Sequence, residues 1–212
     1  MSDSHHESLI NAAEAGDESA LATLFDEYRE RLVRMVKLRL DRRLVRRVDP
    51  VDVVQDTYLA IRSKFAKHFS QEKLPFYVWV RMEAAQKLID VHRFHLGAKM
   101  RDVSQEVSIY RGGMPSIESV TLAEKLLGRL STASQAAMKA ELKLKVQDAL
   151  NSMDVRDREM LVLRHFEEMS NSEAAMCLDI SPSAACNRYI RALGRLKSVF
   201  ARMPGGMDGV GQ

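Results

Sequence analysis

Residues 170–196 read SNSEAAMCLDISPSAACNRYIRALGRL, and this stretch decides the expected fold. Ser170 stands three residues before Glu173, which is the spacing of a capping box at the start of a helix. Ser181 and Pro182 supply an N-cap and a first helical residue for a second helix. Two helices joined by a short turn, with arginines along the second, are typical of a helix-turn-helix.

The second helix of this pattern is expected to present polar and basic residues to DNA. Its apolar residues are predicted to face inward: Cys186, Ile190, Leu193 and Phe200. The outward face is then predicted to contain Ser183, Ala184, Asn187, Arg188, Arg191 and Arg195. Such a helix enters the major groove, where arginines reach guanine or phosphates. An ordinary helical hairpin with solvated arginines is the alternative interpretation.

The composition of the whole chain favours helices. Its 212 residues are 46% hydrophobic and 29% charged, which is an ordinary globular balance. Aromatic residues make up only 6%, whereas helix-forming Leu, Ala, Arg, Met and Glu are plentiful. No apolar run approaches the roughly 18 residues of a membrane span, and the acidic N-terminus is not a signal peptide. We therefore expect an all-α protein in the cytoplasm, without a membrane contact.

Neither a cofactor nor a metal ion is expected. Cys177 and Cys186 are too few for a disulfide framework, and no Cys-x-x-Cys occurs. His92 and His95 could share a helix face, but no cysteine lies near them and the nearby acids lack ligand spacing. The chain has no Gly-rich phosphate loop and no nucleophile–base pair. These observations predict a protein that is not an enzyme.

The net charge of +3 conceals blocks of opposite sign. Residues 1–30 hold eight acids and one base, residues 31–47 hold eight bases and one acid, and residues 179–203 hold five bases and one acid. Basic blocks suit a polyanion, because each phosphate contact releases counterions. Solvated helix faces explain the same charges without any ligand. The acidic head is predicted to disfavour non-specific contact with DNA.

A helix is predicted to begin at Asp49-Pro50, after an earlier helix that starts at Asp17. Its apolar stripe is expected to comprise Val51, Val54, Tyr58, Ile61 and Phe65. A second, partly exposed face carries acids and one apolar residue: Asp52, Gln55, Asp56 and Leu59.

After an expected loop at residues 68–74, Pro75 opens another helix. Aromatic Phe76 and Trp79 alternate along it with the basic residues Arg81, Lys87 and Arg93. Interleaved aromatic and basic residues are typical of surfaces that bind single strands, where bases stack on rings. Core packing explains Trp79 equally well, so both interpretations stay open.

Residues 97–135 change in character, because glycines, a proline and scattered Ser and Thr interrupt any long period. We expect a linker here, with a short helix at about residues 122–130. Helices resume near residue 135 and lead into the helix-turn-helix.

The segment from Met153 to Phe166, followed by the helix-turn-helix, resembles sigma region four. Upstream, residues 49–61 resemble the polymerase-binding helix of sigma region two, and residues 76–90 resemble its −10-element helix. The order of these regions resembles an extracytoplasmic-function (ECF) sigma factor of the sigma-70 family. The implied organisation is an acidic segment at 1–16, region two at 17–102, a linker at 103–135, region four at 136–203 and a tail at 204–212.

This resemblance implies roles for particular residues. Contacts with the β′ clamp helices of core RNA polymerase fall on Asp52, Gln55, Asp56 and Leu59. Contacts with the −10 element fall on Trp79, Arg81, Gln86, Lys87 and Arg93, and residues 67–74 match the loop that captures a flipped base. Contacts with the −35 element fall on Ser183, Ala184, Asn187, Arg188, Arg191 and Arg195. The β flap and an anti-sigma factor are further implied partners, and the basic run 31–47 is expected to hold DNA or polymerase.

Departures from the family pattern bear on promoter sequence. Gln86 stands where Asn is frequent, and Cys186 stands where Lys is common. Asp179 replaces a frequent turn glycine, and Asp tolerates the left-handed conformation. Two other functions stay open: a helix-turn-helix regulator that acts without polymerase, and a helical adaptor that binds only protein.

Overall fold

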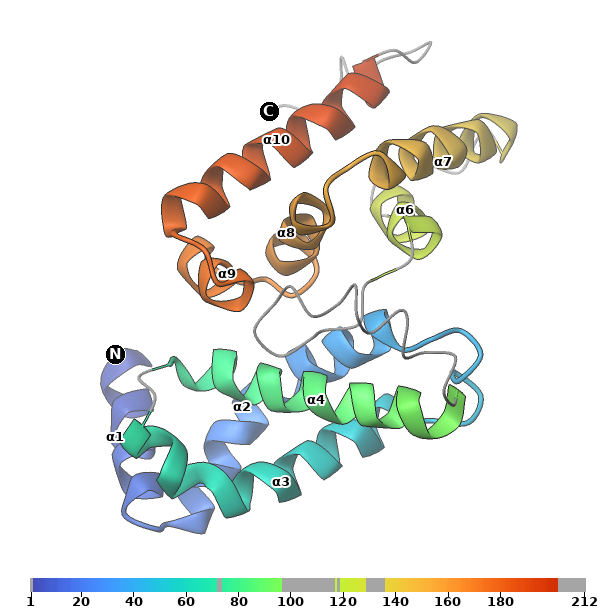
Figure 1. Cartoon of the computed structure of the whole chain (residues 1–212). Helices are drawn as coiled ribbons and strands as arrows, with labels where there is room; N and C mark the ends of the chain where they lie inside the picture. Colours follow the sequence, from blue (N-terminus) through green and yellow to red (C-terminus); the bar gives the residue numbers. More distant parts are fainter. Residues whose placement is uncertain (1, 72–73, 97–116, 118, 129–135, 202–212) are drawn as a thin grey trace. The chain divides into compact units, whose positions relative to one another are not determined.

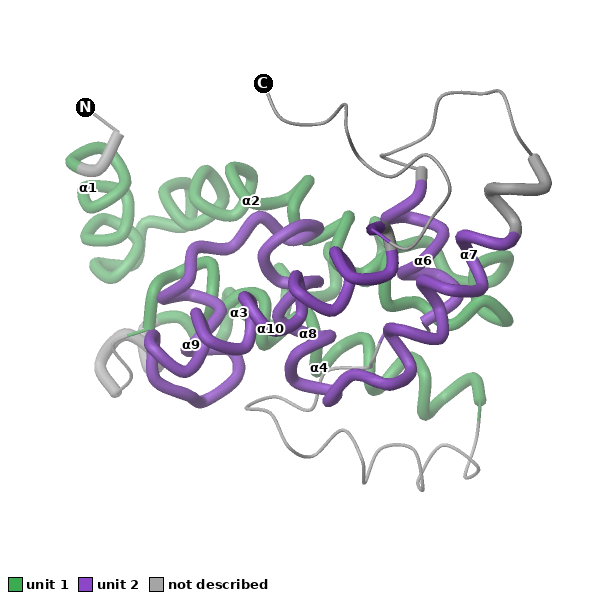
Figure 2. The backbone as a smooth tube through the Cα atoms, turned by 90° about the horizontal axis from the view of Figure 1, so that it is seen from above, with its two compact units in different colours: residues 1–115 green, residues 116–212 purple. Residues whose placement is uncertain are grey.

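The computed structural model describes residues 2–71, 74–96, 117, 119–128 and 136–201 (Figure 1). All regular structure in these residues is α-helical, as predicted from the composition. The chain forms two compact units, residues 1–115 and 116–212, which Figure 2 colours separately. The predicted linker residues 103–116 and 129–135 and the tail 204–212 lie outside the described residues.

Unit 1 begins with two helices, α1 (Ser2–Glu14) and α2 (Glu18–Arg39). Gly16 turns the chain between them with φ of 96°, a conformation that glycine adopts at little cost. Asp17 caps α2 by accepting from the Ser19 and Ala20 N–H groups, as its sequence position predicted. Helix α1 packs against α2 and α3, so the acidic N-terminal segment is an integral part of the unit.

Helix α3 (Pro50–Gln71) begins where the Asp49-Pro50 pair predicted. The Asp49 carboxylate accepts from the Val51 N–H at 2.9 Å. The predicted apolar stripe is wrong at its first member, because Val51 is 44% exposed. The buried face begins two residues later, at Val53, and uses Val53, Val54, Thr57, Ile61 and Phe65. The helix also continues to Gln71, which shortens the loop expected from residue 68.

Helix α4 (Phe76–Leu96) brings an aromatic cluster into the core of unit 1. Trp79 packs against Phe65 and Phe76, with ring centroids 5.8 Å and 6.2 Å away. Tyr77 stacks on Tyr28 of α2 at 5.1 Å. Tilted and offset ring pairs of this kind favour close packing, and they join α4 to both α2 and α3.

Unit 2 begins with α6 (Ser119–Gly128) and α7 (Ala136–Asn151), which pack against each other. Helix α6 lies within the range expected to be linker, close to the short helix predicted there. A helix of this length is only marginally stable by itself in water. Helix α6 is stabilised by packing, because Leu122, Ala123 and Leu127 are buried.

The helix-turn-helix follows as α8 (Val155–His165), α9 (Asn171–Leu178) and α10 (Pro182–Ala201). The capping box of α9 is present: Ser170 Oγ accepts from the Glu173 N–H, and Glu173 Oε2 accepts from the Ser170 N–H. Asp179 ends α9 in the left-handed conformation, with φ of 52°. The Ser181 hydroxyl accepts from the Ala184 N–H, so each predicted cap is confirmed.

The predicted inward face of α10 is wrong at three of its four members, and the side chain of the fourth, Phe200, lies outside the described part of the structure. Cys186, Ile190 and Leu193 are exposed, whereas the buried residues are Ala185, Ala192 and Leu196. Both sets follow helical spacing, so periodicity alone does not distinguish them. The two alanines lie on the buried face and let α10 approach α8 and α9 closely.

His92 fastens the end of α2 to α4. Its ring is buried, and its Nε2 accepts a hydrogen bond from the Asp41 N–H at 3.2 Å. Burial lowers the pKa of His92 below its ordinary value; the Asp41 carboxylate opposes this effect and the Arg43 guanidinium adds to it. The neutral ring is therefore the form that the fold stabilises.

We predict that unit 1 loses stability as the solution is acidified from about pH 7.5 to about pH 5.5, because the unfolded His92 gains a proton that the folded ring resists. The variant His92→Gln should lose less stability over the same interval. Trp79 is the single tryptophan and lies in unit 1, so its fluorescence in urea reports this unfolding. Equal pH dependence in the two proteins would contradict the assignment.

Candidate functional site

The acidic face of α3 is fully at the surface. Asp52, Gln55, Asp56 and Leu59 are all exposed, and Leu59 is 59% exposed. Within the described part of the chain, neither carboxylate has an ion-pair partner. Val51 lies on the same side, one turn before Gln55, and was missed because its spacing also fits the buried stripe. We call Val51, Asp52, Gln55, Asp56 and Leu59 the acidic docking face.

The residues predicted on α4 divide into buried and exposed groups. Trp79 is 4% exposed and Arg81 is 3% exposed, so both lie in the core, not on the surface. Core packing is therefore the correct interpretation of Trp79 in this structure. Lys87 is half-buried, and Gln86 and Arg93 are exposed. The aromatic residues at the start of α4 did not show in advance which side chains would be buried, because an aromatic ring suits a core cluster as well as a stacking surface.

The exposed part of α4 carries mixed charge. Gln86 Nε2 donates to Asp90 Oδ1 at 3.1 Å, and the Arg93 guanidinium lies 3.9 Å from the same carboxylate. Phe94 projects beyond them and is 84% exposed. Phe94 was not predicted as a site residue, although an aromatic next to Arg93 is a signal for a stacking surface.

The basic run 31–47 presents only part of its charge to solvent. Arg31 lies over the Tyr77 ring at 3.8 Å, and Arg39 is buried. Asp41 accepts from Arg43, and this contact lowers the pKa of the Asp41 carboxyl below its usual value. The exposed cations are Arg34, Lys37, Arg42, Arg43, Arg46 and Arg47.

The predicted DNA-contacting residues of α10 also differ in exposure. Ser183 and Asn187 are exposed, Ala184 is half-buried, and Arg191 has a side chain that is 60% exposed. The Arg188 side chain is only 21% exposed and pairs with Asp154 and Asp157. The predicted outward face therefore loses Arg188 and gains Ile190, which is 59% exposed.

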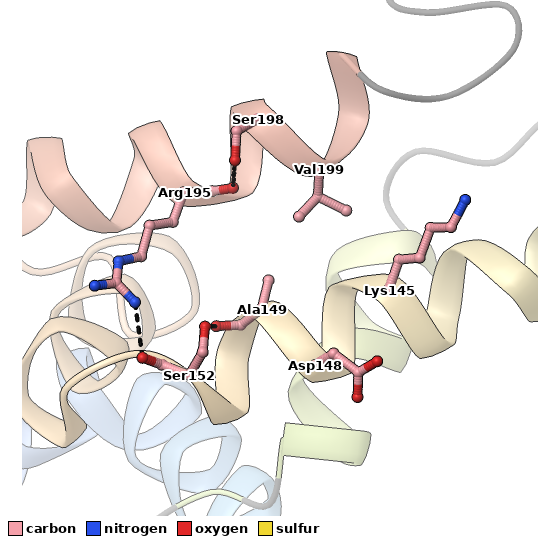
Figure 3. Close-up of a pocket in the computed structure, with 7 residues that line it drawn as sticks. All are labelled: Lys145, Asp148, Ala149, Ser152, Arg195, Ser198 and Val199. Atoms are coloured by element: carbon pink, nitrogen blue, oxygen red, sulfur yellow. Dashed lines mark hydrogen bonds between the residues drawn. The ribbon is translucent and has the colours of Figure 1, made fainter.

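A shallow groove runs between α7 and the second half of α10 (Figure 3). Arg195 crosses it and donates from Nη1 to the Ser152 carbonyl at 2.7 Å. Ala149 and Val199 point toward each other and form its apolar part, with Lys145 and Asp148 at one end. The groove is open to solvent and its lining is mixed in polarity, unlike the enclosed and mostly apolar pockets that hold small molecules.

The described residues hold no group of three or more side chains suited to binding a metal ion. Among the helices in these same ranges, none is both long and apolar enough to span a membrane.

Comparison with known proteins gives a consistent result. The family model described as ECF sigma factor matches residues 4–198. The sigma factor NccH of Alcaligenes xylosoxydans xylosoxydans is 28% identical over 195 residues, which cover 92% of this chain and 94% of that protein. The sigma factor CnrH of Cupriavidus metallidurans is 28% identical over 153 residues, covering 72% of this chain and 73% of CnrH.

A solved structure shares the fold. It is CnrH in complex with the cytosolic domain of CnrY, and it covers 92% of this chain and 96% of its own. The TM-score is 0.53 at 21% sequence identity. At this identity the similarity concerns the helical architecture alone.

The burial of Trp79 leads to a stability prediction. Trp79→Ala should lower the free energy of unfolding by about 3–5 kcal/mol, because it removes a large side chain from the aromatic cluster. Gln86→Ala on the exposed side of the same helix should change it by no more than about 0.5 kcal/mol. Urea unfolding followed by circular dichroism measures both. Equal and small effects would place the Trp79 ring at the surface.

Proposed function

Because the chain belongs to the ECF sigma factor family, we propose that it binds core RNA polymerase, recognises −35 and −10 promoter elements and initiates transcription. The resemblance read from its sequence motifs is thereby confirmed at the level of the family. Members are transcription initiation factors, so the polymerase carries out the chemistry. The observation that most supports the proposal is the acidic docking face, whose carboxylates and apolar residues are exposed together on one helix.

The acidic docking face is assigned to the β′ clamp helices of the polymerase. Asp52 and Asp56 lie one turn apart and suit a basic partner surface. Val51 and Leu59 flank them, are 44% and 59% exposed, and supply apolar area for a contact. Opposite charges around an apolar contact favour correct docking and rapid association.

Recognition of the −10 element is assigned to the exposed side of α4. Gln86, Lys87 and Arg93 are the predicted residues that remain accessible there. Trp79 and Arg81 support this surface from below, since both are buried. The predicted base-capturing loop, residues 67–74, lies mostly outside the residues whose side chains the structure describes.

Recognition of the −35 element is assigned to α10. Ser183, Asn187 and Arg191 lie on its first three turns and are accessible to a major groove. The β flap is the expected polymerase partner of unit 2, and the groove between α7 and α10 offers it a surface.

A regulatory protein partner is also proposed. The solved CnrH structure contains the cytosolic domain of a second protein, CnrY. We extend this arrangement to an anti-sigma factor that would hold the present chain inactive, in the cytoplasm. A regulator without polymerase docking and an adaptor that binds only protein are the other two functions considered, and the family match favours neither.

The double charge reversal Asp52→Lys with Asp56→Lys tests the assignment. We predict at least about a tenfold loss of run-off transcription with purified core polymerase, because like charges would meet at the contact. Binding to duplex −35 DNA should be unchanged, since that surface lies in unit 2. Asp26→Lys is the matched control: Asp26 is exposed on α2, outside the docking face.

Unchanged transcription in the double variant would show that the docking assignment is wrong. Loss of DNA binding and transcription together would instead point to damage of the whole fold. A protein that binds duplex DNA normally but never supports transcription would favour a regulator acting without polymerase.

A further inference from the structure

The Asp157 carboxylate joins α8 to two turns of α10. It lies in the first turn of α8, and its side chain is 8% exposed. Asp157 Oδ1 accepts from Arg188 Nη1 at 2.7 Å and from Arg191 Nη2 at 3.4 Å. Arg188 Nη1 also donates to Asp154 Oδ1 at 3.0 Å. One guanidinium is thus held by two carboxylates.

This pairing differs from the exposed ion pairs of the chain. Pairs such as Lys145 with Glu141 have both side chains well exposed and contribute little to stability. In contrast, Asp157 is shielded from solvent, so removing Arg188 would leave a buried carboxylate with only its longer contact to Arg191. A short charge-assisted hydrogen bond in such a position fixes geometry strongly.

The remaining contacts of α10 lead back to the same region of unit 2. Arg195 Nη1 donates to the carbonyl of Ser152, two residues before Asp154. At the far end of α8, the Tyr189 hydroxyl lies 3.1 Å from His165 Nε2. The buried Ala185 and Ala192 of α10 allow close helix packing. The orientation of α10 is therefore set by several side-chain contacts within unit 2.

We propose that Asp157, with Asp154, is a positioning residue that holds Arg188 and so fixes the orientation of the recognition helix. Arg188 itself serves this internal role and does not contact bases or phosphates. This inference rests on the proposed function, because it concerns how α10 is presented to −35 DNA.

Arg191 has a different role under this proposal. Its contact with Asp157 is longer, and its side chain is 60% exposed. Its guanidinium can turn from the carboxylate to a phosphate while Arg188 remains in place. The surface offered to DNA is then formed by Ser183, Asn187, Ile190 and Arg191.

Salt dependence distinguishes positioning from direct phosphate contact. Affinity falls as salt rises, and each phosphate contact makes the negative slope of log affinity against log salt concentration steeper by about 0.9. Removing Arg188 should therefore leave this slope unchanged if it only positions α10. Arg191→Ala should make the slope shallower by about one, because one phosphate contact is lost.

The experiment uses the full chain and two duplexes, one selected from a random library by the wild-type protein and one scrambled. For Arg188→Ala and for Asp157→Asn we expect the ratio of selected to scrambled binding to fall about tenfold or more, because a tilted helix misplaces its base contacts. Arg188→Lys should restore much of the ratio, since a single nitrogen makes both contacts in the wild type. Glu141→Gln, which breaks an exposed pair in the same unit, is the control and should have no effect.

Each result has a defined meaning. A shallower salt slope in Arg188→Ala would overturn the positioning role. So would a discrimination ratio that stays unchanged in both Arg188→Ala and Asp157→Asn. If Asp157→Asn proves unfolded by circular dichroism, the comparison of Arg188→Ala with Arg188→Lys decides alone. A wild-type chain that fails to discriminate any duplex would overturn the proposed function, and the positioning role with it.

Discussion

Each helix of this chain buries one face against its neighbours, and that requirement decides which charged residues remain for partners. In α3 the buried face runs from Val53 to Phe65, which leaves Asp52, Asp56 and Leu59 outside. In α4 the ring cluster takes Trp79 and Arg81 into the core. In α10 the buried face passes through Ala185 and Ala192, so Asn187 and Ile190 face solvent. The candidate site therefore consists of the faces of α3, α4 and α10 that are not buried against other helices.

Local features were predictable from the sequence because their causes are local. The caps at Asp17, Asp49, Ser170 and Ser181 depend on a side chain and an N–H group two or three residues away. The left-handed Asp179 is likewise a property of one residue in a turn. The helical class, the order of the helices and the family followed from these features and from the motifs between them.

Features that depend on tertiary contacts were not predictable in the same way. Two apolar sets on α10 both have helical spacing, and the positions of α7, α8 and α9 decide which is buried. Asp157 and Arg188 are separated by 31 residues, so no local pattern reveals their contact. The exposed Val51 was missed for a related reason, since its helical spacing assigned it to the apolar stripe.

The direct measurement of the central claim is run-off transcription with purified core polymerase, the full chain and a library of promoter fragments. The account predicts transcripts that appear only with the chain present and that come from fragments sharing both a −35 and a −10 sequence. Transcripts that are no more abundant or selective than with core polymerase alone would contradict it.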